Sequence, residues 1–211
     1  MIIAIDGTAG VGKGTLAKGL AEALNLALLD TGLLYRAVAY EMRSQGISED
    51  DEIGAELTAK ELSLETLDHP ELRTPAISLM ASKISAYRGV RSALIDFQRE
   101  FAHHPSKGYS GTILDGRDIG TVVCPGATFK FFLTASAQIR AQRRHKEILA
   151  NKQFIEFEEL LRQMELRDLQ DATRAIAPLK PAQDAHILDT GFLSPAEVLE
   201  KALSIIRVKS I

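Results

Sequence analysis

Residues 7–15 read Gly-Thr-Ala-Gly-Val-Gly-Lys-Gly-Thr, and this segment constrains the fold more than any other. It follows a short apolar run at residues 2–5 and precedes Leu16, Leu20 and Leu24, which have helical spacing. Glycine adopts positive φ angles at no steric cost, so the chain can turn tightly and direct several N–H groups at one centre. The helix N-terminus adds a partial positive charge. The segment therefore predicts a phosphate-binding loop between a buried strand and a helix.

The predicted loop departs from the strict phosphate-loop pattern at one position. Gly14 stands where a serine or threonine normally follows the lysine, and Thr15 comes one residue later. Lys13 can reach the outer phosphates of a nucleoside triphosphate, whereas a direct hydroxyl ligand for Mg²⁺ is shifted to Thr15 or replaced by water. The alternative is a glycine-rich turn that only packs a helix on a strand. The candidate triphosphate-binding residues are Gly7, Gly10, Gly12, Lys13, Gly14 and Thr15.

Short apolar runs alternate with segments of helical periodicity along the whole chain, which predicts an α/β fold. The runs lie at residues 2–5, 27–29, 112–114, 128–133 and 186–188. Their continuous apolar character is typical of strands buried on both faces of a parallel sheet. Helices are predicted over residues 13–24, 33–45, 50–62, 76–86, 90–103, 136–150 and 154–173, and from Pro195 onward. Residues 63–75 are ambiguous because Pro70 and Pro75 interrupt them.

Acidic residues follow several of the predicted strands. Asp6, Asp30, Asp115 and Asp189 each come at the end of an apolar run. Ligands of open parallel sheets bind beyond the carboxyl ends of the strands, so these carboxylates are expected near the binding site. Asp115 and Thr15 are candidates for contact with Mg²⁺ through water. The alternative for Asp115 is a strand-end carboxylate that caps the next turn.

Composition narrows the class of protein. The 211 residues fit one globular domain, or one domain carrying small lobes. A formal charge of −3 argues against a general nucleic-acid binder, and no apolar run approaches the ~18 residues that span a bilayer. One cysteine, Cys124, excludes an intrachain disulfide. Together with an N-terminus that lacks a basic leader, it favours a reducing cytoplasm.

Three further segments are distinctive. They are Leu-Asp-Thr-Gly-Leu-Leu-Tyr-Arg at 29–36, Leu-Asp-Gly-Arg-Asp-Ile-Gly-Thr-Val-Val at 114–123, and 167–179, which ends in Arg-Ala-Ile-Ala-Pro-Leu. With the glycine loop, they make the chain resemble the bacterial cytidylate kinase family of P-loop nucleoside monophosphate kinases, from residue 3 to about residue 203. One departure is visible, since residues 60–75 are too few for the small β-sheet that many members carry there.

The resemblance implies a P-loop kinase with a five-stranded parallel sheet flanked by helices, a small monophosphate-binding lobe and a lid. The core would comprise residues 1–35, 88–142 and 175–211, the lobe residues 36–87, and the lid residues 143–174. It implies transfer of the γ-phosphate of ATP, with Mg²⁺, to CMP or dCMP by a monomer. The alternatives are a kinase for UMP or another monophosphate, and a non-catalytic P-loop module. A switch or motor module is disfavoured, because a guanine-reading Asn-Lys-x-Asp segment is absent from the sequence.

The resemblance also assigns roles to individual residues. The implied catalytic residues are Lys13, Arg117, Arg143 and Arg174. The implied CMP contacts are Thr31, Tyr35, Arg36, Ser82, Arg91, Arg117, Asp118, Arg167, Asp171 and Arg174, of which Ser82, Arg91 and Asp118 recognise cytosine. Arg140, Arg143 and Arg144 would begin the lid, and without the resemblance they would be read as a solvated helix face.

Overall fold

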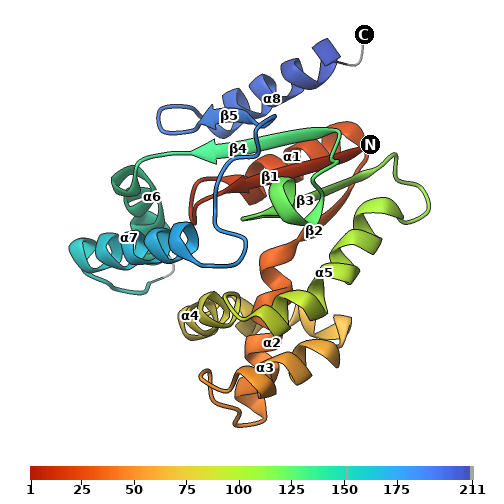
Figure 1. Cartoon of the computed structure of the whole chain (residues 1–211). Coiled ribbons are helices and arrows are strands. Elements are labelled where there is room, and N and C mark those ends of the chain that lie inside the picture. The colour runs from red at the N-terminus through yellow and green to blue at the C-terminus, as the bar shows by residue number, and fades with distance from the viewer. Residues whose placement is uncertain (151, 210–211) are drawn as a thin grey trace. The chain divides into compact units, whose positions relative to one another are not determined.

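A computed structural model of the chain describes residues 1–150 and 152–209, and it contains a five-stranded parallel sheet (Figure 1). The strands are β1 (Ile2–Gly7), β2 (Ala27–Asp30), β3 (Thr112–Gly116), β4 (Phe129–Thr134) and β5 (His186–Asp189). Their order in the sheet is β2-β3-β1-β4-β5. In the parallel register Asp6 lies opposite Gly116 of β3, and Gly7 lies opposite Leu133 of β4. All five predicted strands are confirmed.

The predicted helices are also present, with shifted ends. They are α1 (Lys13–Leu24), α2 (Thr31–Ser44), α3 (Glu52–Lys60), α4 (Pro75–Ile84), α5 (Arg88–His103), α6 (Ala137–Ala150), α7 (Phe157–Thr173) and α8 (Pro195–Lys209). Helix α7 begins three residues after the predicted residue 154. The chain first has to turn back after α6, where Lys152 adopts a left-handed conformation and the Gln153 N–H donates to the Ile148 carbonyl at 3.1 Å.

The ambiguous segment forms two short 3₁₀ helices, η1 (Leu64–Asp68) and η2 (Pro70–Arg73), and residues 61–74 contain no strand. The expectation that this stretch is too short for a small sheet is therefore confirmed. Pro70 and Pro75 both stand at a first helical position, where the missing N–H costs nothing because it would have no partner in the helix. The prolines therefore start new helices at the points where they interrupt the pattern.

The chain divides into two compact units, which are Met1–Leu29 with Ala102–Ile211, and Asp30–Phe101. In the first unit α1 and α8 pack on one face of the sheet, against alternate residues of β1 and β4. In the second unit α2 packs against α3 and α4. Leu34, Val38 and Met42 are spaced four apart on α2 and are fully buried, so they supply the apolar stripe that holds this unit together.

A π-helical turn, η3 (Ile119–Val123), follows β3, and the sequence patterns did not predict it. Such turns are rare and occur frequently at functional sites. This one directly follows Arg117 and Asp118, two of the residues that the resemblance assigns to CMP.

Candidate active site

The glycine loop joins β1 to α1 and has the backbone that a phosphate cradle requires. Gly7, Gly10 and Gly12 have φ angles of 150°, 74° and 99°, which L-residues with a side chain rarely adopt. A Cβ atom on Gly7 would lie 2.5 Å from the carbonyl oxygen of Leu133, so the close approach of β1 to β4 also demands glycine here. Gly12 caps α1, and Lys13 is the first residue of the helix.

Side chains from three different segments hold the carbonyls of this loop. Lys13 Nζ donates to Thr8 O, Arg140 Nη1 to Ala9 O and Thr190 Oγ1 to Val11 O, each at 2.9 Å. The peptide bond is planar and trans, so the N–H of the following residue points opposite to each held carbonyl. The three bonds therefore fix the orientations of the Ala9, Gly10 and Gly12 N–H groups. Arg140 and Thr190 were not predicted in this role.

Lys13 is the central cation of the site, and it is only 8% exposed. Burial lowers its pKa to about 7, and the charges of Arg117 and Arg167 act in the same direction. The carboxylates of Asp115 and Asp6 act against this shift but do not reverse it. Burial and the two neighbouring arginines thus disfavour the charged form of Lys13. A phosphate beside Lys13 would restore its ammonium form and would be held by it.

Thr15 lies in the first turn of α1 and Asp115 lies beside that turn, where Mg²⁺ would accompany a bound triphosphate. Asp115 is buried at the end of β3, and a Cβ atom on Gly14 would lie 3.6 Å from its Oδ2 atom. Thr15 is exposed and adjoins Gly14. Among the described residues no group of three metal-ligating side chains is found. This donor set fits Mg²⁺, which keeps several waters and binds through one or two carboxylates and the substrate phosphates.

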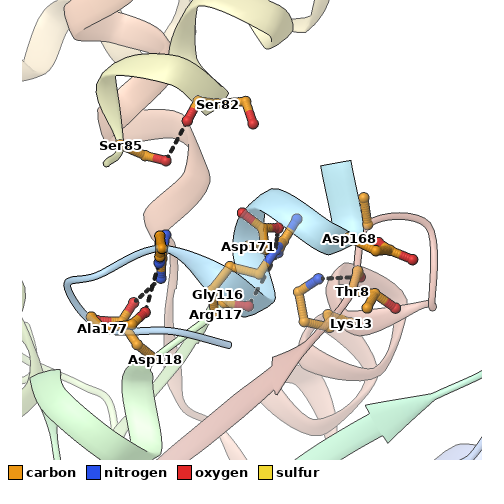
Figure 2. A network of polar contacts seen from close by, with 12 residues as sticks. Thr8, Lys13, Ser82, Ser85, Gly116, Arg117, Asp118, Asp168, Asp171 and Ala177 are labelled. Atoms are coloured by element: carbon orange, nitrogen blue, oxygen red, sulfur yellow. Dashed lines mark hydrogen bonds and ion pairs between the residues drawn. The ribbon is translucent and has the colours of Figure 1, made fainter. Parts of the chain in front are cut away.

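Two ion pairs join the segment after β3 to the C-terminal end of α7 (Figure 2). Arg117 Nε donates to Asp171 Oδ2 at 2.9 Å, and Arg117 Nη1 donates to the Gly116 carbonyl at 3.2 Å. Arg174 Nη2 lies 3.5 Å from Asp118 Oδ1, and its Nε donates to the Ala177 carbonyl at 2.6 Å. Four of the residues predicted to bind CMP are therefore brought together in one unit, with their guanidinium and carboxylate groups interleaved.

A second group of predicted CMP residues clusters within the unit Asp30–Phe101. The Arg91 guanidinium lies over the Tyr35 ring, 5.8 Å from its centroid, and Arg91 Nη1 donates to the Ser85 carbonyl at 3.2 Å. Ser85 Oγ in turn donates to the Ser82 carbonyl at 2.7 Å (Figure 2). Ser85 was not predicted, and it fixes Arg91 relative to Ser82. No sequence motif marks such a role, because the contact uses only a backbone carbonyl.

Two other predicted residues of this unit lie on α2. Thr31 is buried at the first position of the helix. Arg36 Nη1 donates to the Leu72 carbonyl at 3.2 Å, so the side chain spans from α2 to η2.

The three arginines predicted to begin the lid have three different environments. Arg140 is 3% exposed and, besides Ala9 O, it binds the Ala135 carbonyl and forms an ion pair with Asp168 of α7. Arg143 Nη2 donates to the carbonyls of Thr190 and Gly191, at 2.6 and 3.1 Å. Arg144 is exposed and pairs with Glu147 on its own helix. Sequence spacing could not distinguish them, because all three share one helix face.

The cations of this arrangement could bind several phosphate oxygens at once. The amino-acid sequence also matches a known family. A family model described as cytidylate kinase matches residues 3–208. The chain belongs to the cytidylate kinase family. The cytidylate kinase of Azorhizobium caulinodans is 50% identical over 206 residues, covering 98% of each chain. That of Xanthobacter autotrophicus is 46% identical over 209 residues, covering 99% of this chain and 98% of its own.

Solved structures agree on the fold of this cytidylate kinase family member. The shikimate kinase of Bacteroides thetaiotaomicron superposes with a TM-score of 0.51 at 15% identity, over 100% of this chain and 99% of its own. The P-loop kinase fold expected from the resemblance is therefore confirmed. Within the described residues, no helix is long and apolar enough to cross a membrane.

The buried ammonium gives a prediction for stability. The pKa of Lys13 is about 7 in the folded chain, against 10.5 for an unburied lysine. At a pH between these two pKa values, Lys13 is protonated in the unfolded state and neutral in the folded state. The contribution of Lys13 to the free energy of unfolding therefore rises with pH. We expect Lys13→Met to exceed the wild type in stability at pH 6, with a difference that shrinks as pH rises above 7. Urea denaturation of both proteins, and of the exposed α1 variant Lys18→Met, measures this. A difference independent of pH would contradict it.

Proposed function

We propose that this chain transfers the γ-phosphate of ATP to CMP or dCMP, giving ADP and CDP or dCDP. One observation carries the proposal, namely the position of Arg117. Its charge acts on Lys13 of the phosphate loop, while its Nε atom binds Asp171, a residue assigned to CMP. One side chain therefore links the loop that would hold the donor to the residues that would hold the acceptor.

On the donor side, the backbone N–H groups of residues 7–15 and the Lys13 ammonium would hold the β- and γ-phosphates of ATP. The donor phosphates would gain further neutralising charge from Mg²⁺ when it is bound. Asp115 and Thr15 would hold it through water. Arg143 and the rest of the predicted lid, residues 143–174, would close over the donor.

On the acceptor side, Arg36, Arg117 and Arg174 would hold the CMP phosphate. A guanidinium binds two phosphate oxygens at once, which fixes the acceptor in line with the donor and offsets the repulsion between two anions. The attacking oxygen is already ionised, so we assign no general base. Thr31 and Tyr35 would complete this subsite, and Arg167 and Asp171 would face the ribose.

The base would be recognised by Ser82, Arg91 and Asp118. Cytosine carries an N4 amino group, a donor that suits the Asp118 carboxylate, whereas uracil presents an acceptor oxygen at the same position. A carboxylate facing that oxygen would be repelled. We therefore favour CMP over UMP. A monomer in a reducing cytoplasm stays our expectation, and the buried thiol of Cys124 is compatible with it.

A panel of acceptors tests the proposal. We expect ADP release from ATP with CMP and dCMP, and far slower release with UMP, AMP and GMP, in a coupled assay of the wild-type protein. Faster turnover with UMP or AMP would contradict the base assignment. No ADP release with any acceptor would contradict the enzymatic activity itself.

Arg174 provides a mutational prediction with a matched control on α8, outside the predicted lid. Arg174→Ala removes a cation that would act on the transferred group, and we expect kcat to fall about 100-fold or more, as when one preorganised donor is lost. Arg207→Ala removes an exposed α8 arginine that pairs with Glu200, and should leave kcat within about twofold. Steady-state kinetics and thermal melting are measured on both. If Arg174→Ala lost activity only in proportion to folded protein, its catalytic role would be excluded.

A further inference from the structure

Asp6 is a buried carboxylate that the catalytic account above does not use. It is the last residue of β1 before Gly7 and is 4% exposed. Its Oδ1 atom accepts a hydrogen bond from the Ile119 N–H, and its Oδ2 atom accepts one from the Gly120 N–H, both at 2.8 Å. A single carboxylate thus accepts hydrogen bonds from two consecutive backbone amides, one with each of its oxygens.

The Ile119 and Gly120 amides immediately follow Asp118, the residue we assign to the cytosine edge. The Asp118 carbonyl accepts hydrogen bonds from the N–H groups of Val122 and Val123, at 2.8 and 3.2 Å, which closes the π-turn η3. On its other side, the Asp118 carboxylate faces Arg174. The conformation of Asp118 is therefore fixed by the turn that follows it, and Asp6 attaches that turn to β1.

The attachment requires a charged acceptor. An asparagine at this position would accept from one amide and set its own NH₂ group against the other, because only a carboxylate offers two acceptor oxygens. Keeping the charge is costly, since burial raises the pKa of Asp6 to about 6 even though the two N–H groups oppose the shift. The Asp118 carboxylate raises this pKa further, while the Lys13 ammonium lowers it. A group that only attached the turn would not need to be a carboxylate buried beside a second carboxylate, because an uncharged group has a smaller desolvation cost.

We propose that Asp6 is a positioning residue for acceptor-base selection, which holds the η3 turn so that the Asp118 carboxylate is presented to cytosine in one orientation. The inference rests on the proposed CMP kinase activity. It assigns Asp6 a role in choosing the base and none in the transfer step. It also explains why the strand that leads into the phosphate loop ends in a carboxylate.

Two variants test this. Asp6→Asn removes one of the two hydrogen bonds to the turn. We expect KM for CMP to rise about tenfold, which is the usual loss for a hydrogen bond to a charged group. The preference for CMP over UMP should fall by a similar factor. KM for ATP should change less than KM for CMP, although the loss of the Asp6 charge also lowers the pKa of Lys13. Gly120→Ala leaves Asp6 intact but brings a Cβ atom within 3.3 Å of Asp6 Oδ2 and 3.2 Å of Lys130 Cδ, so it should displace the same turn and shift selectivity in the same direction.

The matched control is Asp51→Asn, since Asp51 also accepts a backbone N–H, from Gly54 at 2.9 Å, but caps the exposed start of α3. It should match the wild type. Kinetics are measured well below each melting temperature. Lower stability with an unchanged KM for CMP and unchanged base preference would overturn the proposal, as would equal rises in KM for ATP and CMP. If Asp6→Asn does not fold, a folded Gly120→Ala with wild-type selectivity would overturn it. Failure of the wild type to use CMP would instead contradict the proposed function.

Discussion

The site depends on the burial of the Lys13 ammonium at the turn from β1 to α1. This single group couples the fold to the chemistry, because the glycines allow the turn that places the buried lysine at the start of α1. Its neighbours Arg117 and Arg167 make the charge more costly, and Asp115 and Asp6 only partly offset them. An anionic ligand beside Lys13 would restore its charged form. The turn from β1 to α1 therefore places the lysine where a bound phosphate would stabilise it.

Ion pairs among distant parts of the chain keep the surrounding cations in place. Arg140 joins α6 to Asp168 of α7 and to the phosphate loop, and Arg117 reaches Asp171 one turn further along α7. Arg174 extends the same line to Asp118. These guanidinium groups are held by carboxylates and carbonyls that the protein itself provides. The cations are thus preorganised before any nucleotide arrives, which lowers the cost of orienting a phosphoryl group.

Much of the fold could be predicted from the sequence, because strand burial and helix spacing are local patterns. The five apolar runs and the glycine loop have periodicities that a few neighbouring residues determine. The π-turn after β3 was missed, since it depends on Asp6, more than a hundred residues away. Arg140 was read as part of a lid or a solvated face, although it holds the phosphate loop. A helix face at i, i+3 and i+4 does not reveal which arginine finds a buried carboxylate.

The predicted CMP residues are grouped in each unit in a way that their spacing alone would not indicate. Asp171 and Arg117 are 54 positions apart and still form a direct pair. The resemblance assigned them, and tertiary contacts explain their orientation. Asp6 could have been suspected from its place at a strand end beside the loop, a position it shares with Asp115. The hydrogen-bond partners of Asp6 could not have been predicted, because they are backbone amides and no side chain marks them in the sequence.

The central claim is that the cations around Lys13 direct a phosphoryl group from ATP to a pyrimidine monophosphate. Tracing an isotopic label from the γ-position of ATP in a single turnover tests it most directly. With wild-type protein, CMP and Mg²⁺, the account predicts that the label appears in the β-phosphate of CDP, and that Lys13→Met abolishes this transfer. Label released as inorganic phosphate, or transferred equally well by the Lys13→Met variant, would contradict it.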